Sequence, residues 1–113
     1  MLAVEKQITR KIVEALIAAD LRITVGYDHG YDTTLHGSTD VDAIITACDA
    51  VDECWLMIGE NNDSYDSFIY FIWDNGNNGL DCISDYGMKL QPIMDPICKW
   101  IEDCELTLTE KAA

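Results

Sequence analysis

The sequence predicts an α+β domain in which helices pack on an antiparallel sheet of about five strands. The predicted elements follow the order α-β-β-α-β-β-β-α, and short turns join most consecutive strands. Strands joined by short turns pair antiparallel, because parallel pairing needs a long crossover connection. The chain has 113 residues, of which 49% are hydrophobic. That length and composition suit one domain with a real core, so residues 1–113 are assigned to a single domain.

Each predicted element has its own sequence signal. The helices carry apolar residues three and four positions apart, and the strands are dense in β-branched, aromatic and aliphatic residues. The expected elements are a helix over 3–19, strands over 21–27 and 31–36, a helix over 41–48, strands over 54–58, 68–73 and 80–86, and a helix over 90–104. Segments rich in glycine, asparagine and aspartate separate several of the strands and predict turns. The tail over 106–113 is expected to be frayed.

Several local predictions concern single residues. Glu5 falls among the charged residues of the first helix and is expected on its solvent face. Ser38 or Thr39 is expected to cap the second helix, since a hydroxyl can accept a first-turn N–H. The strand over 68–73 is apolar on both faces. We therefore expect it inside the sheet, with a helix on one side and another covering element on the other.

The last predicted helix contains two prolines. Pro92 and Pro96 do not both fit one regular helix, because proline lacks an N–H and clashes with the preceding turn. Either Asp95 caps a helix that begins at Pro96, or a loose first turn precedes the helix. Trp100 lies on the apolar side and is expected to pack this helix against the sheet.

Charge is the most unusual property of the chain. There are 21 Asp and Glu against 7 Lys and Arg, which gives a net charge of −14 at pH 7. Residues 23–88 contain thirteen of the acids and no lysine or arginine. This balance disfavours direct binding of nucleic acid or an anionic membrane, since nothing offsets repulsion from phosphate. No apolar run is long enough to span a membrane and the first residues lack a signal-peptide pattern, so we expect a cytoplasmic protein.

The acidic segment predicts a protein-binding surface. Aspartates at turns and helix ends hold carboxylates at fixed separations, and residues two apart on a strand lie about 6.6 Å apart, close to the spacing of successive phosphates. Such an array imitates nucleic acid toward a basic groove, and tyrosines among the acids supply anchors for the contact. The expected partner-binding residues are Asp28, Tyr31, Asp32, Asp40, Asp42, Asp49, Asp52, Glu53, Asp63, Tyr65 and Asp66.

Other kinds of site have weaker support. The segment 74–85 partly matches a calcium-binding loop, but Gly76 replaces an expected ligand and Asp85 replaces the bidentate glutamate, so a turn is favoured. The segment 27–32 with His36 could bring carboxylates and imidazoles together, and an exposed turn is again favoured. Five cysteines without a C-x-x-C pair indicate reduced, mostly buried thiols. No catalytic or phosphate-binding motif is present, so we expect no enzyme activity, no metal and no cofactor.

A family resemblance covers about a third of the chain. The segment Trp73–Tyr86, followed by a short link and an apolar helix, resembles the C-terminal half of small acidic proteins encoded by phages and plasmids. Its most specific part runs from Asp81 to Tyr86, within a G-x-D-x-I-S-D-Y-like pattern that begins at Gly79. The resemblance implies a mobile-element context, in which acidic anti-CRISPR and anti-restriction proteins inhibit host defence. It carries over no catalytic residue.

Two hypotheses of function follow. The first is a non-enzymatic inhibitor of the host cell's defence, which blocks the DNA- or RNA-binding groove of a nuclease or CRISPR effector complex by imitating nucleic acid. The alternative is a small interaction or regulatory domain whose acidity is incidental, with a homodimer through a sheet edge or helix as one form. A calcium-binding module or a small enzyme is a third, less favoured class.

Overall fold

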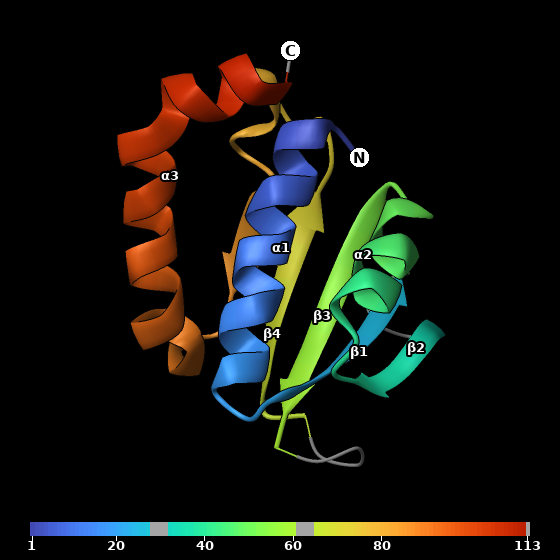
Figure 1. Cartoon of the computed structure of the whole chain (residues 1–113). Helices are drawn as coiled ribbons and strands as arrows, with labels where there is room; N and C mark the ends of the chain where they lie inside the picture. The colour runs from blue at the N-terminus through green and yellow to red at the C-terminus, as the bar shows by residue number, and fades with distance from the viewer. Residues whose placement is uncertain (28–31, 61–64, 113) are drawn as a thin grey trace.

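The chain folds into the predicted α+β arrangement of five strands and three α-helices (Figure 1). The computed structural model describes residues 1–27, 32–60 and 65–112, with the backbone alone over 105–112. The elements are α1 (Ala3–Ala18), β1 (Arg22–Tyr27), β2 (Asp32–Ser38), α2 (Val41–Asp49), β3 (Glu53–Gly59), β4 (Ser67–Ile72), the 3-10 turn η1 (Asn77–Gly79), β5 (Ile83–Tyr86), the 3-10 turn η2 (Met88–Leu90) and α3 (Gln91–Ala112). The predicted fold class and element order are confirmed.

The sheet has the strand order β2-β1-β3-β4-β5, and every neighbouring pair is antiparallel. Trp55 on β3 lies opposite Gly26 on β1 and Tyr70 on β4. Tyr70 in turn lies opposite Asp85 on β5. Side chains of directly opposite residues share a face of the sheet, so Trp55, Tyr70 and Asp85 form one row across three strands.

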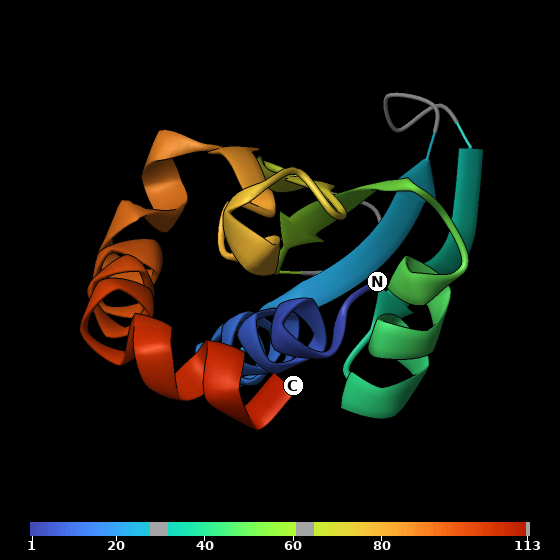
Figure 2. The ribbon, with the colours of Figure 1, turned by 90° about the horizontal axis from the view of Figure 1, so that it is seen from above.

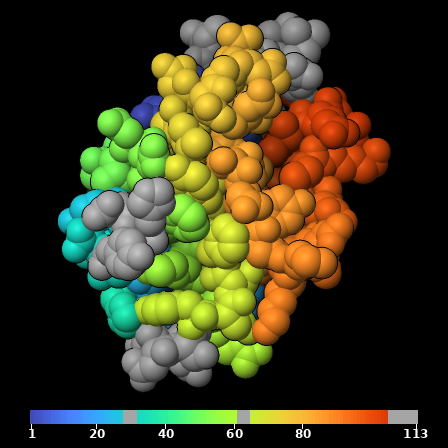
Figure 3. Space-filling view, turned by 180° about the vertical axis from the view of Figure 1, so that it is seen from behind, coloured from blue at the N-terminus to red at the C-terminus, as the bar shows by residue number. Residues whose placement is uncertain are grey.

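The three helices lie on the same face of the sheet, as the two perpendicular ribbon views show (Figures 1 and 2). Alternate residues of β3 face them: Cys54, Leu56 and Ile58 are buried, whereas Trp55 and Met57 between them are partly exposed. The opposite face carries the side chains of β3, β4 and β5 at the molecular surface, seen in green, yellow and light orange in Figure 3. In the part of the chain that the structure describes, no helix covers that face, where the sequence predicted a second covering element.

Glu5 lies in the core, so its expected place on the solvent face of the first helix is wrong. It is fully buried, and its carboxylate accepts the backbone N–H of Leu2 at 2.6 Å and that of Asp74 at 2.7 Å. The chain after β4 returns across the first turn of α1 and brings the part-buried N–H of Asp74 within hydrogen-bond distance of the Glu5 carboxylate. The burial of Glu5 is therefore accompanied by a hydrogen bond to the loop between β4 and β5, which is far away in sequence.

Asp40 caps α2, and the expectation that Ser38 or Thr39 does so is wrong. The Asp40 carboxylate accepts the N–H of Ala43 at 3.2 Å. The hydroxyl of Ser38 instead accepts the N–H of Asp40 at 3.0 Å, so it holds the capping residue and not the first turn of the helix. A carboxylate at this position also benefits from the positive end of the helix dipole.

The helix α3 runs through both prolines. It begins at Gln91 after the turn η2, so a short 3-10 turn does precede it and Asp95 is not its cap. Pro92 stands in the first turn, where no intrahelical N–H bond is made, and only Pro96 removes a helical hydrogen bond. The helix continues to Ala112 through the segment for which the sequence predicted a frayed tail.

The chain between β4 and β5 is a packed loop. Its turn η1 contains Gly79, which is buried with φ +89°, and a Cβ there would stand 2.7 Å from Cγ1 of Val4 on α1. Glycine is thus required both by the backbone conformation and by the close approach to α1. Consequently β5 begins at Ile83, three residues later than the sequence indicates.

Candidate protein-binding surface

An aromatic cluster occupies the open face of the sheet. We define it as Trp55 on β3 with Phe68 and Tyr70 on β4. The rings of Trp55 and Tyr70 are stacked with centroids 4.3 Å apart, and the rings of Trp55 and Phe68 lie 5.6 Å apart. All three side chains are partly exposed to solvent. Large, rigid aromatic side chains on an uncovered sheet face are typical of protein-binding surfaces.

Two carboxylates flank this cluster. Glu53 accepts a hydrogen bond from the hydroxyl of Tyr70 at 2.6 Å, and this bond raises the pKa of Tyr70 above its usual value. Asp85, on the other side, lies opposite Tyr70 in the sheet register. Both acids are exposed. The open face therefore combines apolar rings with negative charge.

Tyr65 is held over the other end of this face. Its hydroxyl lies 2.8 Å from Oγ1 of Thr24, which donates to it, and 3.0 Å from Nδ1 of His36. Thr24 is fully buried, and its Oγ1 also accepts the N–H of Gly37 at 2.9 Å. These contacts fix one predicted partner-binding tyrosine above β1 and β2.

Three of the predicted partner-binding acids already have cationic partners within the chain. Asp42 pairs with Arg10 at 2.8 Å, and Asp66 pairs with Lys89 at 3.1 Å. Asp49 lies 3.1 Å from the Met1 amine and 3.2 Å from Lys6. The hydrogen bond from the Met1 amine, followed by that from Lys6, lowers the pKa of Asp49 below its usual value. These carboxylates are partly neutralised before any partner arrives.

The remaining predicted residues fall into two groups. Asp32, Asp52 and Glu53 are exposed, at the start of β2 and at the start of β3, and Asp40 is the exposed cap of α2. The predicted Asp28, Tyr31 and Asp63 lie outside the described residues. The structure thus brings Glu53 and Tyr65 to the open face. It does not assemble the described acids into one array there.

The sequence did not identify four residues of this surface: Trp55, Phe68, Tyr70 and Asp85. The signal that could have found the three aromatic residues is the doubly apolar character of β3 and β4, which needs a covering layer on both sides. Asp85 joins them through the strand register, in which it lies opposite Tyr70. Where the helices cover only one side, the second apolar layer becomes a surface.

The bases occupy a different part of the molecule. Five of the seven belong to helices, namely Lys6, Arg10 and Lys11 on α1 and Lys99 and Lys111 on α3. The other two are Arg22, the first residue of β1, and Lys89 in η2. From Ile23 to Met88, which spans the rest of the sheet, there is none. By sequence, α2 and the strands after Arg22 therefore carry acids and no base.

Among the described residues, no group of three or more His, Cys, Asp or Glu side chains is close enough to hold a metal ion. No helix in the described ranges is both long and apolar enough to cross a membrane. No family model, curated protein or solved structure matches this chain.

Proposed function

We propose that this protein is a non-enzymatic inhibitor that docks on a basic nucleic-acid-binding protein and blocks the groove that holds DNA or RNA. The host-defence nucleases and CRISPR effector complexes that the phage and plasmid resemblance implies are the proposed targets. One observation carries the proposal: residues 23–88 contain thirteen carboxylates and no lysine or arginine, and two of these carboxylates, Glu53 and Asp85, flank the aromatic cluster on the open face. A surface with a single sign of charge attracts a partner of opposite charge and accelerates the encounter.

The docking surface of this proposal is the open face of the sheet. A partner arginine would stack on the ring of Trp55 or Phe68 and pair with Glu53 or Asp85. Stacked aromatic rings supply contact area and lifetime, whereas the carboxylates supply orientation and speed of association. Asp42, Asp49 and Asp66 would contribute less than the sequence predicted, because each already has a cationic neighbour.

A second candidate function is an interaction domain that pairs with another copy of itself through the same face. The aromatic cluster favours this candidate, since partly exposed rings on a sheet often form a self-complementary contact. The net charge of −14 on each chain opposes it, and this repulsion weakens with salt. A rising dimer fraction with rising salt is therefore the signature of the second candidate, and a falling affinity for a basic partner is that of the first.

The test is a competition experiment with purified CRISPR effector complexes and restriction nucleases, each loaded with fluorescent nucleic acid. The unmodified protein is expected to displace nucleic acid from at least one of them. The double variant Glu53→Lys/Asp85→Lys should lose at least about tenfold in apparent affinity, because like charges then face each other across the contact. The matched control is Glu14→Lys/Asp103→Lys, which reverses two exposed acids on helices.

Two results would count against the proposal. One is that no complex in the panel releases its nucleic acid. The other is that the sheet-face variant and the helix variant inhibit equally, since general acidity rather than the open face would then be responsible. Thermal melts of both variants show that any loss of inhibition is not a loss of folding.

A further inference from the structure

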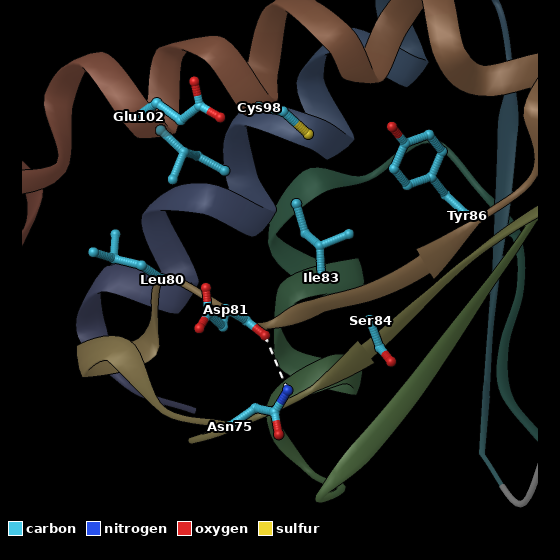
Figure 4. Close-up of a pocket in the computed structure, with 9 residues that line it drawn as sticks. Asn75, Leu80, Asp81, Ile83, Ser84, Tyr86, Cys98 and Glu102 are labelled. Atoms are coloured by element: carbon cyan, nitrogen blue, oxygen red, sulfur yellow. Dashed lines mark hydrogen bonds between the residues drawn. The ribbon is translucent and has the colours of Figure 1, made fainter.

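A pocket of about 440 Å³ lies at the opposite edge of the sheet from β2, between β5, the loop before it and α3 (Figure 4). None of its lining residues belongs to the aromatic cluster. Its volume falls within the roughly 300–1,000 Å³ of sites that hold small molecules. It is therefore large enough for a ligand or for a side chain of a partner protein.

Apolar side chains from three segments line this pocket. Leu80 comes from the loop after η1 and Ile83 from β5 (Figure 4). Ile101 comes from α3. Leu80 is buried, and Ile83 and Ile101 are partly buried. These aliphatic walls favour a hydrocarbon chain over a strongly hydrated group.

The charged groups that line the pocket are both carboxylates. Asp81 lies in the loop before β5 and Glu102 on α3, so they approach the pocket from different segments (Figure 4). Both side chains are exposed, and neither forms an ion pair with another side chain that the structure describes. No lysine or arginine lines the pocket. An anion would be repelled here, and a cation would be attracted.

Four neutral polar side chains complete the lining, those of Asn75, Ser84, Tyr86 and Cys98. Tyr86 and Cys98 lie next to each other where β5 meets α3 (Figure 4). Burial, and then the nearby carboxylate of Asp95, raises the pKa of the Cys98 thiol. Burial, followed by Cys98 and Asp95, raises the pKa of Tyr86. Both groups stay protonated at neutral pH, so they add no positive or negative charge.

We propose that this pocket binds an aliphatic organic cation, an ammonium or guanidinium group on a chain about as long as the four-carbon stem of lysine. The chain would lie against Ile83 and Ile101, and the cationic head would lie between Asp81 and Glu102. Two sources carry this chemistry: a free amine or guanidine, and a lysine or arginine side chain of a protein. Only the second source rests on the function proposed above.

The first test uses n-butylguanidinium chloride as the probe and backbone amide shifts in NMR spectra as the readout. We expect saturable shifts centred on Ile83, Cys98 and Ile101, and weaker binding as salt is added. n-Butanol has the chain without the charge, and guanidinium chloride has the charge without the chain. Each should bind more weakly than the probe that combines them.

The second test removes the charges without changing shape. Asp81→Asn and Glu102→Gln should each weaken probe binding about two- to fivefold, as loss of one exposed ion pair does. Glu14→Gln is the matched control, since Glu14 is exposed on α1, and it should bind as the unmodified protein does. Unchanged amide shifts elsewhere in each variant show that the fold is intact.

The proposal is overturned if n-butanol binds as tightly as n-butylguanidinium, if both charge-removing variants bind like the control, or if no shifts centre on the pocket. A blocked Gly-Arg-Gly peptide identifies the source. Binding of the peptide as well as the free cation supports a partner's side chain, and binding of the free cation alone supports a small molecule. The competition experiment uses variants outside the pocket, so the two proposals fail independently.

Discussion

The carboxylate of Glu5 accepts a hydrogen bond from the backbone N–H of Asp74 at 2.7 Å, across 69 positions of the chain. The same carboxylate accepts the N–H of Leu2 at the start of α1. One buried side chain thus joins the first turn of the first helix to the loop between β4 and β5. That loop also supplies Leu80 and Asp81 to the pocket, so Glu5 indirectly positions part of the pocket wall.

Glu5→Ala is expected to lower the free energy of unfolding by about 2–4 kcal/mol, because two part-buried N–H groups lose their charged acceptor. Urea denaturation monitored by tryptophan fluorescence measures the change. Glu14→Ala, an exposed position on the same helix, is the control and should change stability by less than about 0.5 kcal/mol. A loss below 1 kcal/mol for Glu5→Ala would show that water or another group takes over these donors.

Gly79→Ala should destabilise the protein more than Gly76→Ala. Both glycines have positive φ, +89° and +102°, so both substitutions cost backbone strain of about 1 kcal/mol. Only at Gly79 would the new Cβ meet Val4 at 2.7 Å, whereas it finds open space at Gly76. We expect a difference of at least about 1 kcal/mol between the variants in thermal melts. Equal losses would mean that α1 moves away at no cost.

Trp100→Ala should cost about 2–3 kcal/mol, less than the roughly 3–5 kcal/mol for loss of a fully buried large aromatic side chain. Trp100 is only partly buried, and the Nζ of Lys11 on α1 lies 4.7 Å from its ring centroid. Its removal therefore weakens the packing of α3 as well as one cation–π contact. Lys11→Ala is the companion variant and should cost less than about 1 kcal/mol. If the two variants cost the same, the apolar packing of Trp100 contributes nothing.

Stability should fall in alkaline solution as the pH rises above 9. Burial, followed by the charge of Glu5, raises the pKa of Cys82 from an ordinary 9.0 to about 12. A hydrogen bond with Cys48, whose Sγ lies 3.2 Å away, and then burial raise the pKa of Cys54. Between pH 9 and 12 the unfolded chain releases thiol protons that the folded chain keeps, so the equilibrium shifts toward the unfolded state.

The measurement is urea denaturation at several pH values between 8 and 11. Cys82→Ala should flatten the pH dependence, since it removes one of the groups whose pKa differs between the two states. Cys104→Ala alters a less buried cysteine and is the comparison. An unchanged slope in Cys82→Ala would exclude this thiol as a source of the alkaline sensitivity.

The element order and the fold class could be predicted because they depend on local periodicity, which the chain shows clearly. The burial of Glu5 could not be predicted, because its carboxylate bonds to the loop that contains Asp74, 69 positions further along the chain. Contacts distant in sequence also changed the predicted set of partner-binding acids. Asp42 pairs with Arg10 and Asp49 pairs with Lys6, because α2 packs beside α1. Charge counted along the chain gives no information about such neighbours.

The strand order also has a consequence for how the chain reaches this fold. β1 with β2, and β3 with β4 and β5, are neighbours in sequence, so each set closes short loops. The pairing of β1 with β3 instead joins segments separated by β2 and α2, from Arg22 opposite Gly59 to Gly26 opposite Trp55. Closing that longer loop costs entropy before its contacts form. We therefore expect the β1–β2 hairpin and the β3–β4–β5 segment to form first and to pair with each other late. The pairing of β1 with β3 would then set the folding rate.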